Sequence, residues 1–379
     1  MARSRLRRRF DGLRTVARTG ALANAPRRFR AEVDAAPAAV LDTETPLPDL
    51  DLARPPWPGE VVDAGGADVF VRHTPTTAPG EAPTAVYVHG LGGASTNWTD
   101  FAGQLAGTVD GFALDLPGFG RSGPSPTGEY TPAAHTRTLL AYLETLAAAG
   151  RGPVHLFGNS MGGAISIAAA ARRPDLVRTL TLISPAVPDL RVRRDDDPRA
   201  ALLLVPGVAQ LALRRLAQAN SHARARAVIE LCFGDPSRVP AHRIDEAAAE
   251  IDERAGYAWG QHAFTASMKG LIGSWFTARP WHDLAAVTAP TLVVWGDRDR
   301  LVSPALAPRV AAIVPRARLL VLEGVGHVAM LEDPVTTARA WLGTLGGDRV
   351  AAASASNAAA TRETRTDRDP GPGGASVPS

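Results

Sequence analysis

The chain has 379 residues, of which 45% are hydrophobic, and a formal net charge of +3. This length and composition allow a large buried core arranged as one or two domains. The single cysteine, Cys232, excludes an intramolecular disulfide framework and supplies too few thiols for a zinc or iron–sulfur site. We therefore expect no bound metal.

Residues 1–58 are predicted to form a basic N-terminal arm followed by a linker. Ten arginines and one aspartate give residues 1–30 a charge of +9, which leaves −6 for the rest of the chain. In the arm, apolar side chains recur at helical spacing, with arginines on the other faces: Leu6, Phe10, Leu13 and Ala17. This pattern suits peripheral association with an anionic membrane. A solvated, disordered extension and a secretion signal are the competing interpretations.

The sequence contains no stretch of about 18–20 uninterrupted apolar residues, so we expect no membrane-spanning helix. The expected location is the cytoplasm, with membrane association through residues 1–30 as the alternative. Apart from the basic charge of the arm, no motif favours nucleic-acid binding, and we expect no nucleic-acid partner.

Strand-like and helix-like segments alternate over residues 59–189. The apolar runs "TAVYVHG" and "PVHLFGNS" end in turn residues, and the helical patterns include "TPAAHTRTLLAYLETLAAAG" and "MGGAISIAAAARRP". The alternation predicts an α/β fold with a mostly parallel central sheet and helices on both of its faces.

The alternation stops near residue 190 and resumes with "APTLVVWGDRD" and "RARLLVLEGVGH". Residues 190–281 have a helical pattern and are predicted to form a cap, or lid, inserted between two strands of one sheet. Such an insertion is expected over the carboxyl ends of the strands, where ligands bind. Residues 282–345 then complete the core, and the polar residues 346–379 are predicted to be disordered.

One serine stands between glycines at a strand-to-helix junction, in "HLFGNSMGGAISI". Ser160 has Gly158 two positions before it and Gly162 two positions after it, which is the pattern of a nucleophile on a strained turn. Glycines there let the strand and the helix approach each other closely. We predict Ser160 to be a catalytic nucleophile; the alternative is an ordinary tight turn.

A serine hydroxyl needs a base to take its proton, and a third group must orient that base. Among the nine histidines, His327 is the candidate, because it lies in a glycine turn after the last predicted strand, in "VLEGVGHVAMLEDP". Asp297 and Asp299 follow the preceding strand and are both candidate acids. The order serine, acid, histidine is the one expected for a nucleophile turn of this kind.

A tetrahedral intermediate also needs hydrogen-bond donors for its oxyanion. We predict the backbone N–H groups of Met161, directly after the serine, and of Leu91, in "HGLGG", to form this oxyanion hole. His89 is expected to shape the loop rather than to act as the base. The continuation "GLGGAS" lacks the third glycine of the dinucleotide-binding fingerprint, so no cofactor is expected.

Five segments in this order resemble the α/β-hydrolase superfamily over roughly residues 59–345: "HGLGGASTNW", "DLPGFGRS", "GNSMGG", "WGDRDRLV" and "GVGHVAMLEDP". In this family the catalytic acid usually lies in the pattern Gly-x-x-Asp-x-x-Val at the end of a strand. Gly296, Asp299 and Val302 match this pattern, which favours Asp299 over Asp297 as the acid. The resemblance thus implies a Ser160–Asp299–His327 triad. A serine nucleophile argues against the epoxide hydrolase and haloalkane dehalogenase branches.

The leading hypothesis is a serine hydrolase that cleaves a small apolar carboxylic ester or acyl substrate through an acyl-serine intermediate, with resemblance to lipases and carboxylesterases. Asn159 before the serine resembles the meta-cleavage-product hydrolases, which cleave carbon–carbon bonds, whereas "GLGG" and Val328 depart from their pattern. A cofactor-free haloperoxidase and a thioesterase would use the same triad. A non-catalytic binding protein on the same scaffold is the hypothesis from a different class.

Candidate substrate-pocket residues are Asn159, Trp275 and Phe276. Further apolar side chains lie in the predicted cap: Leu202 to Val205, Leu211, Leu213 and Trp281. For most of these large side chains, packing inside the cap or against the core is the simpler explanation.

Overall fold

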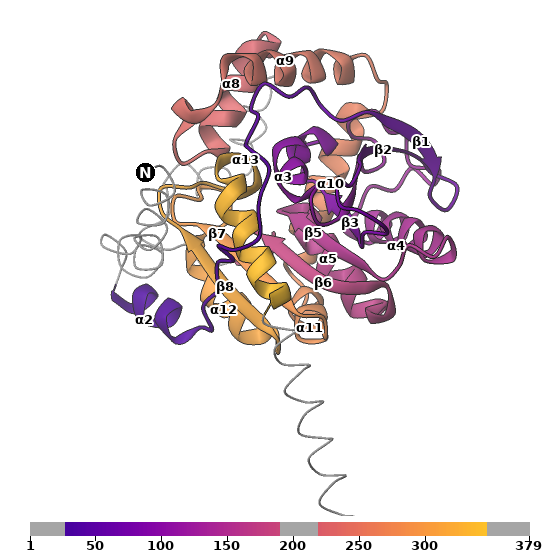
Figure 1. The fold of residues 1–379 in the computed structure, drawn as a ribbon. Helices are drawn as coiled ribbons and strands as arrows, with labels where there is room; N and C mark the ends of the chain where they lie inside the picture. Colours follow the sequence, from indigo (N-terminus) through magenta and orange to yellow (C-terminus); the bar gives the residue numbers. More distant parts are fainter. Residues whose placement is uncertain (1–26, 190–218, 347–379) are drawn as a thin grey trace, which may run out of the picture.

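The structure is a computed structural model that describes residues 27–189 and 219–346 (Figure 1). The predictions made for residues 1–26, 190–218 and 347–379 lie outside these ranges. They include the membrane-binding pattern of the arm, the tail, and the cap residues Leu202 to Val205, Leu211 and Leu213. Across the described ranges, we find no helix that is long and apolar enough to cross a membrane.

An eight-stranded sheet forms the centre of the molecule, in the order β1-β2-β4-β3-β5-β6-β7-β8. β2 pairs antiparallel with β1 and β4, and all other neighbouring strands pair in parallel. The predicted α/β fold with a mostly parallel sheet is therefore confirmed. The strands are β1 (Gly59–Asp63), β2 (Asp68–Thr74), β3 (Thr84–Val88), β4 (Asp110–Leu114), β5 (Val154–Asn159), β6 (Val177–Ile183), β7 (Thr291–Gly296) and β8 (Ala317–Leu322).

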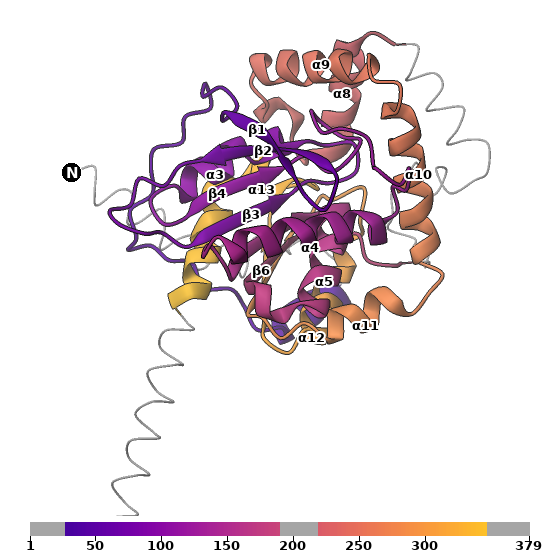
Figure 2. The same ribbon diagram turned by 90° about the vertical axis from the view of Figure 1, so that its right-hand side faces the viewer.

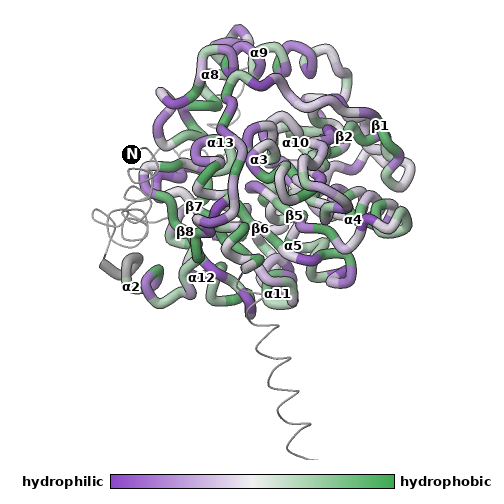
Figure 3. Tube along the Cα trace, viewed as in Figure 1, coloured by the Kyte–Doolittle hydropathy of each residue, from purple (hydrophilic) through white to green (hydrophobic). Residues whose placement is uncertain are grey.

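The central strands are buried on both faces, which is why they appear in the sequence as continuous apolar runs. Every residue of β3, β5 and β7 is buried. Val86 and Val88 join one apolar cluster, whereas Ala85 and Tyr87 join the cluster on the other face, as the alternation of side chains along a strand requires. In Figure 3, green hydrophobic segments lie around β7 and β8, to the left of the centre of the molecule.

Helices cover both faces of the sheet and so close the two apolar clusters. One face carries α4 (Pro132–Ala148), α5 (Met161–Arg172), α11 (Arg279–Ala285) and α12 (Ala307–Ile313). The other face carries the 3₁₀ helix η1 (Ser95–Trp98), α3 (Thr99–Leu105), α13 (Ala329–Glu332) and a helix over residues 334–346. Three further 3₁₀ helices are η2 (Pro174–Leu176), η3 (Pro236–Arg238) and η4 (Pro304–Leu306).

Residues 31–58, predicted as a linker, lie along the core. Helix α2 (Arg27–Ala35) comes first, and the chain then passes the edge strand β8, where the N–H of Ala39 donates to the carbonyl of Leu319 at 2.9 Å. Further along, the indole Nε1 of Trp57 donates to the carbonyl of Thr99 at 3.0 Å. Figure 1 shows this indigo segment running from α2 across the molecule to β1.

The helical insertion lies between β6 and β7. Its described part contains α8 (Ser221–Cys232), α9 (Ala241–Ala255), α10 (Gly260–Ser274) and α11. In Figure 2, α8 and α9 form the top of the molecule and α10 runs down one side. His135 on α4 and Ser267 on α10 are joined by a buried Nε2–Oγ hydrogen bond of 3.0 Å. Helix α11, which spans the predicted boundary after residue 281, packs against α5 of the core.

Candidate active site

Ser160 occupies the turn between β5 and α5 with φ 53° and ψ −118°, in the positive-φ region that non-glycine residues rarely adopt. Such a conformation costs on the order of 1–3 kcal/mol and persists only where the surroundings enforce it. The neighbouring glycines make it possible. A Cβ on Gly158 would lie 2.6 Å from the carbonyl oxygen of Gly162, and one on Gly162 would lie 2.3 Å from that of Val88. The glycines therefore allow β3, β5 and α5 to meet directly around the serine.

His327 lies in the loop after β8, and its imidazole is held by a carboxylate. The Nδ1 of His327 and the Oδ2 of Asp299 are 2.8 Å apart, and both residues are buried. The other oxygen of Asp299 accepts the N–H groups of Leu301 at 2.8 Å and Val302 at 2.9 Å. The carboxylate is thus fixed by its own loop, and Nδ1 of the imidazole faces it, which leaves Nε2 available for chemistry.

Asp297, the second candidate acid, has a different contact. Its Oδ1 accepts the N–H of Gly324 at 2.7 Å, so its carboxylate secures the start of the loop that carries His327. Burial raises the pKa of the Asp297 carboxyl above its ordinary value. The structure therefore brings Asp299, rather than Asp297, to the imidazole.

Asn159 connects the serine turn to the histidine loop. Its side-chain Nδ2 donates to the carbonyl of His327 at 3.0 Å and to that of Ile183 at 3.1 Å, and the residue is 3% exposed. We predicted Asn159 as a substrate-pocket residue, but in this structure its amide hydrogens bind two main-chain carbonyls. Asn159 thus joins the main chain of His327 to the end of β5, directly before Ser160.

The residues predicted to donate to the oxyanion lie at or beside positions that adjoin the serine. Met161 is the first residue of α5, and a Cβ on Gly90, the residue before Leu91, would lie 3.0 Å from the Cβ of Ser160. Across the two described ranges, the N–H groups of Leu91 and Met161 donate no hydrogen bond to a main-chain carbonyl. Two donors at these positions suit an oxyanion that forms on a carbonyl attacked by the serine.

The buried imidazole of His89 shapes the Leu91 loop. Its Nδ1 lies 2.7 Å from the carbonyl of Gly90, and its Nε2 accepts the N–H of Leu116 at 3.0 Å. These partners require the neutral tautomer with the proton on Nδ1. Burial lowers the pKa of His89, which keeps the ring uncharged. The contacts occupy both ring nitrogens, so His89 stabilises the loop and has no free nitrogen to act as a base.

The cap also contacts this loop. Arg254 at the end of α9 donates from Nη1 to the carbonyl of Gly92 at 2.9 Å. A Cβ on Gly92 would lie 3.1 Å from the ring of Phe264 on α10. Helices α9 and α10 therefore both contact the loop that carries Leu91.

Trp275 and Phe276, the remaining predicted pocket residues, follow α10. Trp275 is partly buried and packs against the apolar cluster on the face of the sheet that carries α4 and α5. Phe276 is 73% exposed, so its ring faces solvent in this structure rather than an enclosed pocket.

Arg254 and Glu332 both contact the loops that carry the predicted site, yet no motif in the sequence marks either residue as functional. Arg254 lies on a charged helix face that resembles an ordinary solvated surface. Glu332 follows the apolar run Val328 to Leu331 in the quoted segment "GVGHVAMLEDP", but Asp333 beside it makes the pair resemble an ordinary polar end of a helix. Across the described ranges, no group of three or more histidine, cysteine, aspartate or glutamate side chains could hold a metal ion.

A mostly parallel eight-stranded sheet with a strained serine after β5 and a histidine after β8 is the architecture of the α/β hydrolases. The sequence pattern of the α/β hydrolase fold matches residues 83–334. The chain belongs to this family.

Two relatives illustrate the likeness in sequence and structure. Lipase 3 of Moraxella sp. (strain TA144) is 28% identical over 261 residues, which cover 66% of this chain and 73% of the lipase. The crystal structure of a membrane phospholipase A is 26% identical, with a TM-score of 0.57 and coverage of 77% of this chain and 86% of the phospholipase.

A third relative shares the fold. The crystal structure of a point mutant of a meta-cleavage product hydrolase has a TM-score of 0.60 and 20% identity, and the match covers 76% of this chain and 98% of the hydrolase. The expected resemblance to lipases and to meta-cleavage-product hydrolases within the α/β-hydrolase superfamily is therefore confirmed.

Proposed function

We propose that the protein is a serine hydrolase that cleaves a carboxylic ester through an acyl-serine intermediate. Ser160 is the nucleophile, His327 the general base and Asp299 the group that orients it. The observation that carries this proposal is the 2.8 Å contact between His327 Nδ1 and Asp299 Oδ2 in loops that adjoin the strained Ser160 turn. The contact occupies Nδ1, so Nε2 is the ring nitrogen that would take the proton of the Ser160 hydroxyl.

The reaction proceeds in two halves. His327 Nε2 takes the hydroxyl proton while Ser160 Oγ attacks the ester carbonyl carbon, and the carbonyl oxygen becomes an oxyanion held by the N–H groups of Leu91 and Met161. The intermediate expels the alcohol, which receives the proton from Nε2. Water then attacks the acyl-enzyme and gives a proton to His327. Collapse releases the carboxylic acid, and the proton returns to Oγ.

The proposed substrate is a small apolar ester or acyl compound. Relatives described as a lipase and a membrane phospholipase A support this class. We further propose that residues 190–281 act as a cap over the site. The contacts of Arg254 with Gly92 and of Phe264 beside Gly92 support this placement, because they lie on the loop that carries the Leu91 donor.

The first test is covalent labelling. Fluorophosphonates react with a serine only when it is activated, so the wild-type protein should be labelled and Ser160→Ala should not. Circular dichroism should show that the variant remains folded. Labelling of the Ser160→Ala variant at the wild-type rate would refute the assignment of the nucleophile.

The second test separates ester cleavage from its rivals. Turnover should be measured on a series of p-nitrophenyl esters of increasing acyl length and on a dienone substrate with a scissile carbon–carbon bond. We expect turnover of esters. Turnover of the dienone alone would identify a carbon–carbon hydrolase. That alternative is kept because Asn159 before Ser160 resembles the sequence pattern of the meta-cleavage-product hydrolases. Absence of both labelling and turnover would favour a non-catalytic binding protein.

A further inference from the structure

Glu332 is a carboxylate with no solvent exposure of its side chain. It is the last residue of α13, five positions after His327. Its Oε2 accepts the N–H of Gly326 at 2.8 Å and that of Gly234 at 2.9 Å, and its Oε1 accepts the N–H of Asp235 at 2.9 Å. Burying a carboxylate is costly unless it is paired or hydrogen-bonded, and three main-chain donors satisfy this requirement.

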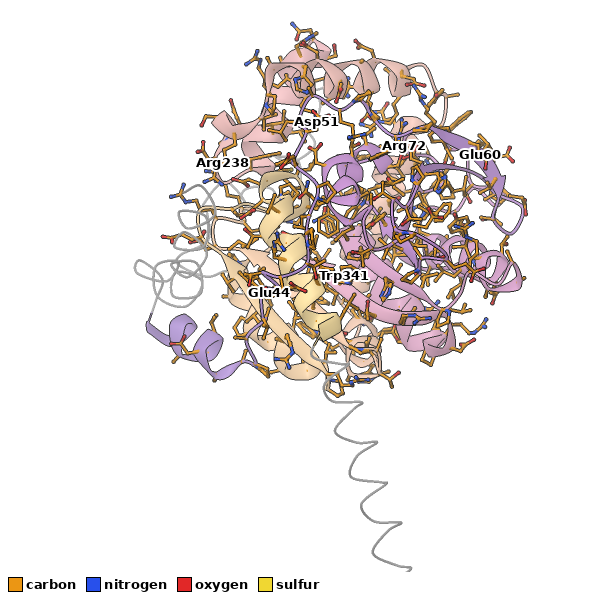
Figure 4. The ribbon with its side chains drawn as sticks, in the orientation of Figure 1. Glu44, Asp51, Glu60, Arg72, Arg238 and Trp341 are labelled. Atoms are coloured by element: carbon orange, nitrogen blue, oxygen red, sulfur yellow. The ribbon has the colours of Figure 1, made fainter. Side chains whose placement is uncertain are left out.

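A positively charged side chain also approaches this carboxylate. Nη1 of Arg238, in η3, lies 3.6 Å from Oε1 of Glu332. Figure 4 shows Arg238 at the junction between the cap and the core. The carboxylate therefore joins three parts of the chain: the turn that carries His327, helix α13, and the cap segment after α8.

The two main-chain segments that Glu332 joins are in direct contact. The N–H of His327 donates to the carbonyl of Cys232 at 2.6 Å. A Cβ on Gly326 would lie 2.3 Å from that carbonyl, and a Cβ on Gly234 would lie 2.4 Å from the carbonyl oxygen of Gly324. Residues 232–235 of the cap thus lie against the turn that presents the base.

This turn depends on outside contacts for its position. Gly324 has φ +71°, and glycines at 324 and 326 give the main chain wide conformational freedom. Asp299 holds only the ring of His327, through Nδ1. The main chain of the turn is held in the core by Asp297 and the Asn159 amide, by Glu332, and by the carbonyl of Cys232 in the cap.

We propose that Glu332 is a positioning residue that aligns His327 by fixing its turn against residues 232–235 of the cap. The inference rests on the proposed function. It adds that the base is aligned only while the cap segment is docked, so that cap position and activity are linked. A small misplacement of a catalytic group costs on the order of 100-fold in rate.

The main variant is Glu332→Gln, which keeps the size of the side chain but replaces one acceptor oxygen with an NH₂ group. That group would face a main-chain N–H, so at least one of the three bonds is lost. We expect kcat to fall about 10- to 100-fold, with KM changed less than about threefold, because ring alignment and not substrate binding is affected.

The matched control is Asp333→Asn. Asp333 is partly buried, and its Oδ1 accepts the N–H of Thr336 at 3.1 Å at the start of the helix over residues 334–346. A loss of packing alone would lower stability in both variants and leave their kcat values alike. We expect near wild-type kcat for Asp333→Asn when both variants are compared at the same folded fraction, measured by urea unfolding.

A second readout does not require ester turnover. The Nδ1–H proton of His327, bonded to Asp299, should give a downfield proton NMR signal that is absent from His327→Ala. In Glu332→Gln we expect this signal to broaden or to exchange faster with solvent, and in Asp333→Asn we expect it unchanged. If the wild-type protein hydrolyses no ester, the proposed function fails, while this signal still tests the alignment.

Arg238→Met provides a variant that will fold, since Arg238 is at the surface and 47% of its side chain is exposed. It should weaken the same contact and slow fluorophosphonate labelling about two- to fivefold. The proposal is overturned if folded Glu332→Gln keeps the wild-type kcat and NMR signal, or if Asp333→Asn loses as much kcat. If Glu332→Gln does not fold, an unchanged signal and labelling rate in Arg238→Met overturns it.

Discussion

Asp297 and Asp299 are two positions apart, yet their carboxylates have different partners. Asp299 contacts the imidazole of His327, while its second oxygen accepts two N–H groups of its own loop. Asp297 contacts the main chain of Gly324 instead. The proposed roles therefore predict very different losses from the same chemical change at the two positions.

Asp299→Asn should lower kcat by about 10³- to 10⁴-fold, because an amide in place of the carboxylate no longer stabilises the imidazolium or the required tautomer. Asp297→Asn should cost less than about tenfold, through a looser turn. Steady-state kinetics on an ester, with circular dichroism as a check of folding, measures both. Equal losses, or a larger loss at position 297, would contradict the assignment of Asp299 as the acid.

At the scale of elements, the contact between α5 and β3 has no room for a side chain. Gly162 is in the first turn of α5, and a Cβ there would lie 2.3 Å from the carbonyl oxygen of Val88 and 2.5 Å from that of His89. Both neighbours are main-chain atoms, so they cannot rotate away as a flexible side chain could.

Gly162→Ala should therefore reduce the free energy of unfolding by about 2 kcal/mol or more. The control is Gly273→Ala in α10, where a Cβ would meet nothing within 4 Å. In a helix interior, alanine is favoured over glycine by up to about 1 kcal/mol, so this variant should be as stable as the wild type or more stable. Urea unfolding tests both, and a neutral Gly162→Ala would show that α5 can shift away from β3.

Helix α9 illustrates a second relation between elements. Its polar face binds the core through Arg243, whose Nη2 lies 2.6 Å from Asp100 on α3, and through Arg254 on the Gly92 carbonyl. Burial raises the pKa of Glu250 on the same helix. Charged side chains on a helix usually indicate a solvent-exposed face, so the sequence does not reveal that this face contacts the core.

At the scale of the whole molecule, two buried histidines make stability depend on pH. Burial lowers the pKa of His135 to about 3 and that of His155 to about 4, from an ordinary value of 6.5. Below pH 6.5 the unfolded chain binds protons that the folded chain does not. The free energy of unfolding should therefore fall as the pH drops from about 6.5 toward 4.

His155→Gln isolates one of these contributions. His155 shares a buried 2.8 Å hydrogen bond with Thr179 on the neighbouring strand. Between pH 7 and pH 4.5, the variant should lose about 1–2 kcal/mol less stability than the wild type. The control His262→Gln changes an exposed ring and should follow the wild-type curve. Identical curves for wild type and His155→Gln would show that His155 is already protonated or released in the folded state.

The basic arm gives a further whole-molecule prediction. Each arginine near an anionic bilayer contributes roughly 1 kcal/mol, so residues 1–30 should confer weak, salt-sensitive binding. Co-sedimentation with anionic and neutral vesicles, at low and high salt, should be compared between the full chain and a version without residues 1–30. Equal sedimentation of the two proteins, or no response to lipid charge, would exclude the arm as a membrane anchor.

The order of the elements, the α/β class and the serine turn can all be predicted from the amino-acid sequence alone. These features depend on local patterns: apolar runs for buried strands, helical spacing for α4 and α5, and glycines around Ser160. Together they also indicated the family, because several short segments occurred in the expected order.

Three hydrogen bonds around the site could be found only in the folded molecule. Asn159 binds the carbonyl of His327, 168 positions away, Glu332 binds Gly234, 98 positions away, and Arg254 binds Gly92, 162 positions away. No local spacing encodes such pairs, since they depend on how the sheet twists and where the cap packs. Their partners are main-chain groups, which nearly every residue type carries, so the hydrogen bond itself does not specify the partner's side chain.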